Sequence, residues 1–161
     1  MNWTTEPDRF GVPGNTFGAV PEDFYAAMGR IVNLGALVEQ RLSLLVEKLA
    51  GLQEKDVAGE QMKDLAKRFD KIAKSRELPT KVLAAKEEAV QAMYDRNAHV
   101  HSLWPSPTAE DARGWRGIPK KQRTEDGPHL EWIFISDSGI RELILRLVRV
   151  VAALNDSTDS V

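Results

Sequence analysis

The sequence predicts a mainly helical protein, a four-helix up-down bundle with a small β-hairpin inserted before the last helix. Three features of the 161 residues indicate this fold. Apolar residues recur every three or four positions in four long segments, which is the spacing of a helix face. Two short β-branched or aromatic runs lie between the third and fourth segments. The connections between the first three segments are short, which favours antiparallel helices.

The first helix is predicted over residues 21–50. Pro21 suits the first turn of a helix, and Gly51 suits the position after the last turn. At ~1.5 Å per residue this helix is about 45 Å long. A helix of that length extends beyond one compact core, so we expect dimerisation along its apolar stripe. The stripe consists of Phe24, Met28, Ile31, Leu34, Val38, Leu42, Leu45 and Leu49.

Two more helices follow, over residues 57–75 and 79–103. The first of these has an apolar face and a basic face, and we interpret the basic face as a solvated surface. The second is stopped by Pro105, because proline cannot continue a helix.

Residues 105–135 form the predicted insertion, since prolines and glycines are frequent among its charged residues. Within it, Trp115 to Ile118 and Leu130 to Ile135 are the two strands of the hairpin. Ser136, Asp137 and Ser138 are candidate caps for the last helix.

The predicted organisation is therefore simple. Residues 1–20 form an irregular arm, residues 21–155 form a single helical domain, and residues 156–161 form a polar tail. The length of the chain suits one domain with one core.

Composition excludes several classes of function. Hydrophobic residues make up 42% and charged residues 29% of the chain, which is ordinary for a folded globular protein. The net charge of −2 means that nucleic-acid binding requires a local basic patch. The chain has no cysteine, which excludes disulfides, thiol nucleophiles and cysteine-ligated metals. Neither a signal peptide nor an apolar run of roughly 20 residues is present, so we expect a cytoplasmic protein without a membrane partner.

The candidate active site is the segment Arg96-Asn97-Ala98-His99-Val100-His101, inside the third predicted helix. Asn97 and His101 are four residues apart and share a helix face. Arg96 is five residues from His101, about 140° around the helix axis, so its long side chain must reach around.

A metal site is not expected at this segment. On a regular helix His99 and His101 point about 160° apart, which suits zinc poorly. No second cluster of histidines or carboxylates supplies further ligands. We therefore expect neither a metal nor another cofactor.

Arginine and histidine together suit the cleavage of RNA. A neutral imidazole can remove a proton from the ribose 2′-hydroxyl, and an imidazolium can return a proton to the leaving group. A guanidinium can hold the phosphate and offset the charge of the transition state.

The segment resembles the signature of the HEPN superfamily, which is arginine, a polar residue, three to five further residues and histidine. The following Ser102-Leu103-Trp104 is similar to bacterial HEPN proteins in which a small residue and an aromatic follow the histidine. The resemblance covers about residues 21–104 and 136–155. It implies a homodimer with both motifs in one cleft, and a metal-independent endoribonuclease of a toxin–antitoxin or phage-defence system. An antitoxin protein is then a possible partner.

The resemblance assigns the catalytic roles to Arg96, Asn97 and His101. His99 is a possible supporting residue, and Glu39 resembles an acidic position of related proteins. Two alternatives stay open: a non-catalytic HEPN module that binds nucleotide or a partner protein, and a structural helical dimer. In the second alternative Arg96 pairs with a carboxylate such as Glu39.

A second candidate surface lies in the insertion. Its cations, with a tryptophan between them, can follow a phosphate backbone and stack a base, so they are candidate RNA-binding residues. A solvated turn is the alternative. These residues are Arg113, Trp115, Arg116, Lys120, Lys121 and Arg123.

Overall fold

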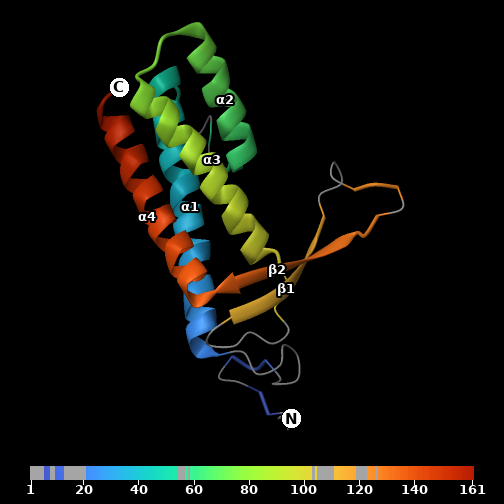
Figure 1. The fold of residues 1–161 in the computed structure, drawn as a ribbon. Helices are drawn as coiled ribbons and strands as arrows, with labels where there is room; N and C mark the ends of the chain where they lie inside the picture. Colours follow the sequence, from blue (N-terminus) through green and yellow to red (C-terminus); the bar gives the residue numbers. More distant parts are fainter. Residues whose placement is uncertain are drawn as a thin grey trace. The chain divides into compact units, whose positions relative to one another are not determined.

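A computed structural model of the chain describes residues 6, 7, 10–12, 21–53, 57, 59–102, 104, 111–118, 123–125 and 127–161, apart from the side chains of residues 111 and 112. The described part is mainly helical, with a two-stranded antiparallel sheet before the last helix, as the sequence predicts. The elements are α1 (Glu22–Ala50), α2 (Met62–Ser75), α3 (Thr80–Val100), β1 (Asp111–Gly117), β2 (Leu130–Ser136) and α4 (Asp137–Asp159) (Figure 1).

The chain divides into two compact units. Residues 1–29 and 98–141 form one, here called the hairpin unit, and residues 30–97 and 142–161 form the other, the bundle unit. The prediction of a single domain over residues 21–155 stays a prediction. Most of the predicted arm over residues 1–20 lies outside the described residues.

Helix α1 matches its predicted range to within a residue. The carbonyl oxygen of Pro21 accepts a hydrogen bond from the N–H of Phe24 (3.0 Å). At the other end Gly51 has a φ of 65°, and the N–H of Leu52 donates to the carbonyl oxygen of Glu47 (3.0 Å). A left-handed glycine followed by this backbone bond is the usual C-terminal cap of a helix.

Helix α2 runs parallel to α1, so the predicted up-down order is wrong for this pair. Glu39 of α1 lies at the start of α2 and accepts the N–H of Met62 (3.2 Å), whereas Arg76, just after α2, donates to the carbonyl oxygen of Leu49 (3.2 Å). The connection over residues 51–61 allows this direction. An extended chain of that length spans about 36 Å, whereas α2 is only about 21 Å long.

Helix α2 also begins at Met62 rather than at residue 57. Gly59 has a φ of 80°, which a helix cannot accommodate. Val57 is nevertheless buried (1% exposed), so its apolar side chain belongs to the core without being helical.

The bundle unit has an apolar core to which all four helices contribute. Its side chains with less than 2% exposure include Ile31, Val38, Leu42, Leu45, Val46, Leu65, Phe69, Val82, Leu147, Val150 and Leu154. Burying each of these large side chains stabilises the fold by roughly 1.5–3 kcal/mol before the entropy cost.

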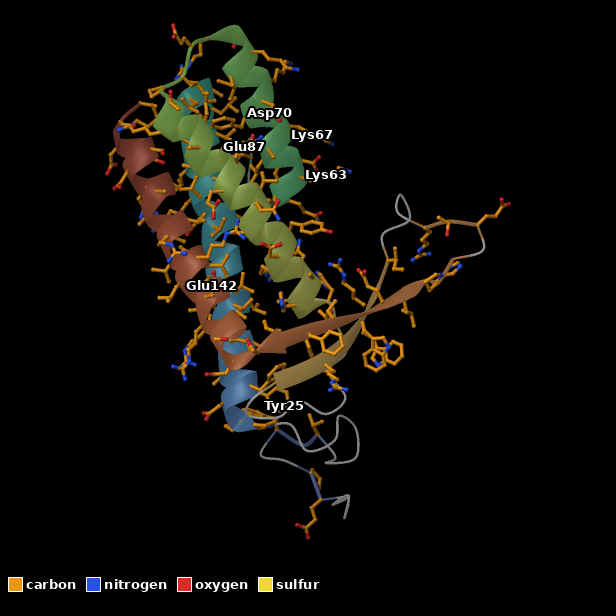
Figure 2. All side chains as sticks on the ribbon, in the orientation of Figure 1. Tyr25, Lys63, Lys67, Asp70, Glu87 and Glu142 are labelled. Carbon is orange, nitrogen blue, oxygen red and sulfur yellow. The ribbon has the colours of Figure 1, made fainter. Side chains whose placement is uncertain are left out.

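Two charged clusters hold neighbouring helices of the bundle unit together. Lys86 of α3 is only 7% exposed and contacts Asp70 of α2 (2.7 Å) and its neighbour Glu87 (2.9 Å), both labelled in Figure 2. Burial lowers the pKa of the Lys86 ammonium, but the hydrogen bonds to these carboxylates outweigh it and the pKa is raised. On the other side of α3, Arg146 of α4 binds Glu88 (2.6 Å) and Asp95.

Helix α4 starts as predicted and ends later than predicted. The hydroxyl of Ser136 accepts the N–H of Gly139 (3.0 Å), which is an N-cap. The helix continues to Asp159, beyond the expected end at residue 155. Its last carbonyl groups have side-chain donors, since the Ser157 hydroxyl binds within the helix and Lys48 Nζ donates to the carbonyl oxygen of Thr158 (2.7 Å).

The hairpin unit contains the predicted β-hairpin. β1 and β2 pair antiparallel over seven residues, from Asp111 opposite Ser136 to Gly117 opposite Leu130. One face is buried at Gly114 and Ile135. A Cβ at Gly114 would lie 2.7 Å from the Trp104 ring, so the absence of a side chain there lets the indole lie on the strand.

Candidate functional site

Arg96 occupies a position on α3 that the sequence analysis did not explain. Its side chain lies against Gly35 of α1, which is buried. A Cβ at Gly35 would lie 2.7 Å from Nε and 3.2 Å from Cδ of Arg96. A glycine inside a helix costs roughly 1 kcal/mol relative to alanine, and here it makes room for the arginine. A lone glycine within the apolar stripe was the signal that could have indicated this contact.

The guanidinium of Arg96 is held without being neutralised. Its Nη1 donates to the side-chain oxygen of Asn97 (2.8 Å), which carries no charge. Nε is buried and has no hydrogen-bond partner among the described residues. None of the ion pairs between described residues includes Arg96. A guanidinium in this state can bind an anion bidentately.

Helix α3 ends at Val100, three residues before the predicted end. Side chains take the carbonyl groups of its last turn, since the Ser102 hydroxyl donates to the oxygen of Ala98 and Trp104 Nε1 donates to that of His99 (3.0 Å). His101 therefore lies in the turn after the helix, where it is exposed. The argument that places Asn97 and His101 on one helix face does not apply to a residue outside the helix.

His99 has a structural role in the hairpin unit. Its ring stacks on Trp104, with centroids 6.2 Å apart and planes 12° apart. Trp104 is 8% exposed and meets Phe24 of α1 edge-on (5.6 Å between centroids). The proposed supporting role of His99 in catalysis is therefore replaced by support of this aromatic cluster.

Glu39, the other supporting candidate, caps helix α2 through its bond to Met62. The N-terminus of a helix attracts a carboxylate, which explains this position. Glu39 also lines a pocket of about 320 Å³ together with Glu47 and Glu60, and no residue of the 96–101 segment lines that pocket. The alternative in which Arg96 pairs with Glu39 is not what the structure contains.

The six candidate RNA-binding residues separate into three groups. Arg113 and Trp115 lie on the face of the hairpin opposite to the buried one. Arg116 lies on the buried side and forms an ion pair with Glu131, so its charge is already matched. Arg123 is exposed and donates from Nε to the carbonyl oxygen of Ile118 (2.7 Å). Lys120 and Lys121 lie outside the described residues.

The structure thus brings Arg96 and Asn97 together within the bundle unit. His99 and His101 belong to the hairpin unit. Among the described residues no group of three histidines or carboxylates is close enough to hold a metal ion. None of the helices in the part of the chain that the structure describes combines the length and apolar character of a membrane span.

Comparison of the chain with models of protein families, with curated proteins and with solved structures gives no match. The functional argument therefore depends on the residues themselves.

Proposed function

We propose that this chain is a metal-independent endoribonuclease of HEPN type, with Arg96 as the phosphate-binding residue and His101 as the acid and base. The observation that carries the proposal is the state of Arg96. Its guanidinium is fixed by Gly35 and Asn97, yet it has no carboxylate partner among the described residues. An exposed histidine follows five residues later in the chain. Arginine and histidine are sufficient for cleavage through the ribose 2′-hydroxyl.

The reaction has two proton transfers and one displacement. The imidazole of His101 removes the proton of the 2′-hydroxyl, and the 2′-oxygen attacks the adjacent phosphorus. The bond from phosphorus to the 5′-oxygen breaks, and an imidazolium protonates that oxygen. The products are a 2′,3′-cyclic phosphate and a free 5′-hydroxyl.

Arg96 has the electrostatic part of this reaction. Its guanidinium stabilises the additional negative charge of the pentacovalent transition state. Asn97 orients the guanidinium through the bond that it accepts from Nη1. Because the oxygen of Asn97 is neutral, it fixes the group without competing with the phosphate as a counter-charge would.

The same proposal includes the assembly and the biological class. We propose a homodimer in which each copy supplies one motif, acting as a toxin or a phage-defence effector with an antitoxin protein as its partner. The exposed apolar residues Leu145 and Val148 of α4 are compatible with a protein contact (57% and 47% exposed).

The proposal is tested by incubating a labelled single-stranded RNA with the wild-type chain in the presence and absence of EDTA. We expect cleavage in both conditions, and losses of about 10²–10⁴-fold for His101→Ala and about 10²–10³-fold for Arg96→Ala. His129→Ala is the matched control, since His129 is an exposed histidine outside the segment. It should cleave at the wild-type rate when RNA saturates the enzyme.

Two outcomes would decide against this function. Cleavage that requires magnesium would contradict the assigned chemistry. Failure to cleave any RNA, combined with nucleotide binding that depends on Arg96, would favour the non-catalytic module.

A further inference from the structure

The outer face of the hairpin, opposite to the buried face of Gly114 and Ile135, carries a row of large exposed apolar side chains. Along β2, alternate residues point to this face because side chains alternate across a strand. Leu130, Trp132 and Phe134 are 55%, 49% and 63% exposed. Exposed apolar groups gathered on one face usually mark a binding surface. The residues of the outer face are Arg113, Trp115, Gly117, Leu130, Trp132 and Phe134.

The aromatic rings of this face are fixed by cross-strand contacts. Trp115 and Trp132 are directly opposite each other, with ring centroids 3.5 Å apart and planes tilted by 37°. The guanidinium of Arg113 lies over the ring of Phe134, its partner across the strands (5.6 Å to the centroid). The rings are therefore already ordered, and a ligand that stacks on them has little side-chain entropy to remove.

Cationic groups stand at both ends of the row. Arg113 is at one end. At the other end a Cβ on Gly117, which would point to the outer face, would lie 4.0 Å from Nη2 of Arg123. The two positions, 113 and 117, are about 13 Å apart along the strand.

The local charge favours an anionic ligand. The stretch from residue 113 to residue 123 contains five lysines and arginines and no carboxylate, although the whole chain has a net charge of −2. The one cation of β1 on the opposite face, Arg116, is neutralised by Glu131. A row of flat rings with a guanidinium at each end therefore matches a chain of stacked bases joined by phosphates.

We propose that the outer face of the hairpin is a stacking platform for single-stranded RNA, which takes two or three nucleotides. The Trp115–Trp132 pair and Phe134 bind base faces, and Arg113 and Arg123 bind the flanking phosphates. Duplex RNA does not fit this surface, because its base faces are stacked on one another. The platform is a binding site additional to the cleavage residues, and it does not require cleavage.

The test measures the affinity of the full chain for a fluorescein-labelled oligouridine of about 12 nucleotides, a length within the range of single-strand sites. All variants are made in the His101→Ala chain so that RNA is not cut. Trp132→Ala and Phe134→Ala should each weaken binding roughly 5- to 150-fold, the scale of one stacked base. Tyr25→Ala is the matched control, since Tyr25 is 46% exposed on α1 (Figure 2). It should leave the affinity within twofold.

A second pair of variants leaves the rings untouched. Arg113→Gln combined with Arg123→Gln should reduce the slope of log affinity against log salt by roughly 0.7 for each lost phosphate contact. Lys81→Gln, at an exposed lysine of α3, is the control and should leave the slope unchanged. Trp132→Phe keeps a ring and should retain more affinity than Trp132→Ala, which separates stacking from a folding defect.

The proposal is overturned if the ring variants bind oligouridine as the parent does, or if duplex RNA binds as tightly as the single strand. It is also overturned if Trp132→Ala changes only the sedimentation of the RNA-free protein, because the face is then a protein contact. RNA that binds through this face but is not cut by the wild-type chain would leave the platform standing and contradict the proposed ribonuclease.

Discussion

The Nε atom of Arg96 occupies the space that a side chain at Gly35 would need, since a Cβ there would lie 2.7 Å from it. This contact joins α1 to α3 inside the bundle unit. Nε is buried without a hydrogen-bond partner among the described residues, so the arrangement carries a cost to stability. An unneutralised arginine held at such a cost is expected where the charge is used.

Gly35→Ala tests this relationship. The added methyl group should displace the guanidinium and lower the cleavage rate by up to the ~10²–10³-fold expected for loss of the arginine. In an unhindered helix the same change stabilises by roughly 1 kcal/mol. Gly29→Ala is the control for that gain, because a Cβ at Gly29 meets no atom within 4 Å. The two variants are compared by denaturant unfolding and by cleavage.

The coupling between the two residues gives the decisive arm of this experiment. In the Arg96→Ala chain the obstacle is gone, so Gly35→Ala should there be as stabilising as Gly29→Ala. Equal effects of Gly35→Ala with and without Arg96 would show that the two side chains do not compete for space.

The bond from Arg146 to Glu88 should contribute a stability that disappears in acid. The hydrogen bond and charge of Arg146 hold the pKa of Glu88 below its ordinary value of 4.5. A lowered carboxyl pKa stabilises the fold above 4.5, and this contribution is lost as the pH falls through the folded value. Because Glu88 is 51% exposed, the contribution is about 1 kcal/mol or less.

The measurement compares the free energy of unfolding of the wild type with that of Arg146→Met. The difference should be constant from pH 7 to about pH 5.5 and shrink below pH 4.5. Arg149→Met, at an exposed neighbour on α4, should show a smaller difference throughout. A difference that grows in acid would contradict the assigned pairing.

Glu39→Ala should destabilise the fold without changing the chemistry. Loss of the cap on α2 should cost about 0.5–2 kcal/mol, the usual value for an N-cap. At a temperature where the variant is folded, its cleavage rate should equal that of the wild type. Gln40→Ala, at the exposed neighbouring residue, should leave both quantities unchanged. A fall in rate for a fully folded Glu39→Ala would return Glu39 to the active site.

The proposed dimer is tested through the exposed face of α4. Leu145→Asp should shift the protein from dimer to monomer in sedimentation at tens of micromolar, because a buried charge opposes association. Leu83→Asp, at a 39% exposed leucine of α3, is the control. A wild-type protein that sediments as a monomer at every concentration would remove the assembly from the proposal.

Much of the fold could be predicted from local signals. Apolar spacing located all four helices, Ser136 capped α4 as expected, and the two aromatic runs formed the hairpin. The direction of α2 could not be predicted in this way, because residues 51–61 are long enough for either direction. Its direction depends on Glu39 and Arg76, whose bonds join residues far apart in the sequence.

The candidate site was predicted less completely. The segment 96–101 was identified, but its geometry was drawn on a helix that continues past His101. The side chains of Ser102 and Trp104 take the last carbonyl groups and end the helix earlier, and no helix periodicity reports such bonds. His99 was likewise assigned to chemistry because its contact with Trp104 depends on where the indole packs.

The most direct measurement of the central claim uses two RNAs of one sequence, one of which has a single 2′-deoxy sugar at the cleaved position. Both are incubated with the wild-type chain in EDTA, and the ends of the products are identified by mass spectrometry. The account predicts that only the unmodified RNA is cut at this position, leaving a 2′,3′-cyclic phosphate that neither His101→Ala nor Arg96→Ala produces at a comparable rate. Cleavage of the deoxy-substituted RNA at the same rate would contradict the roles of both residues.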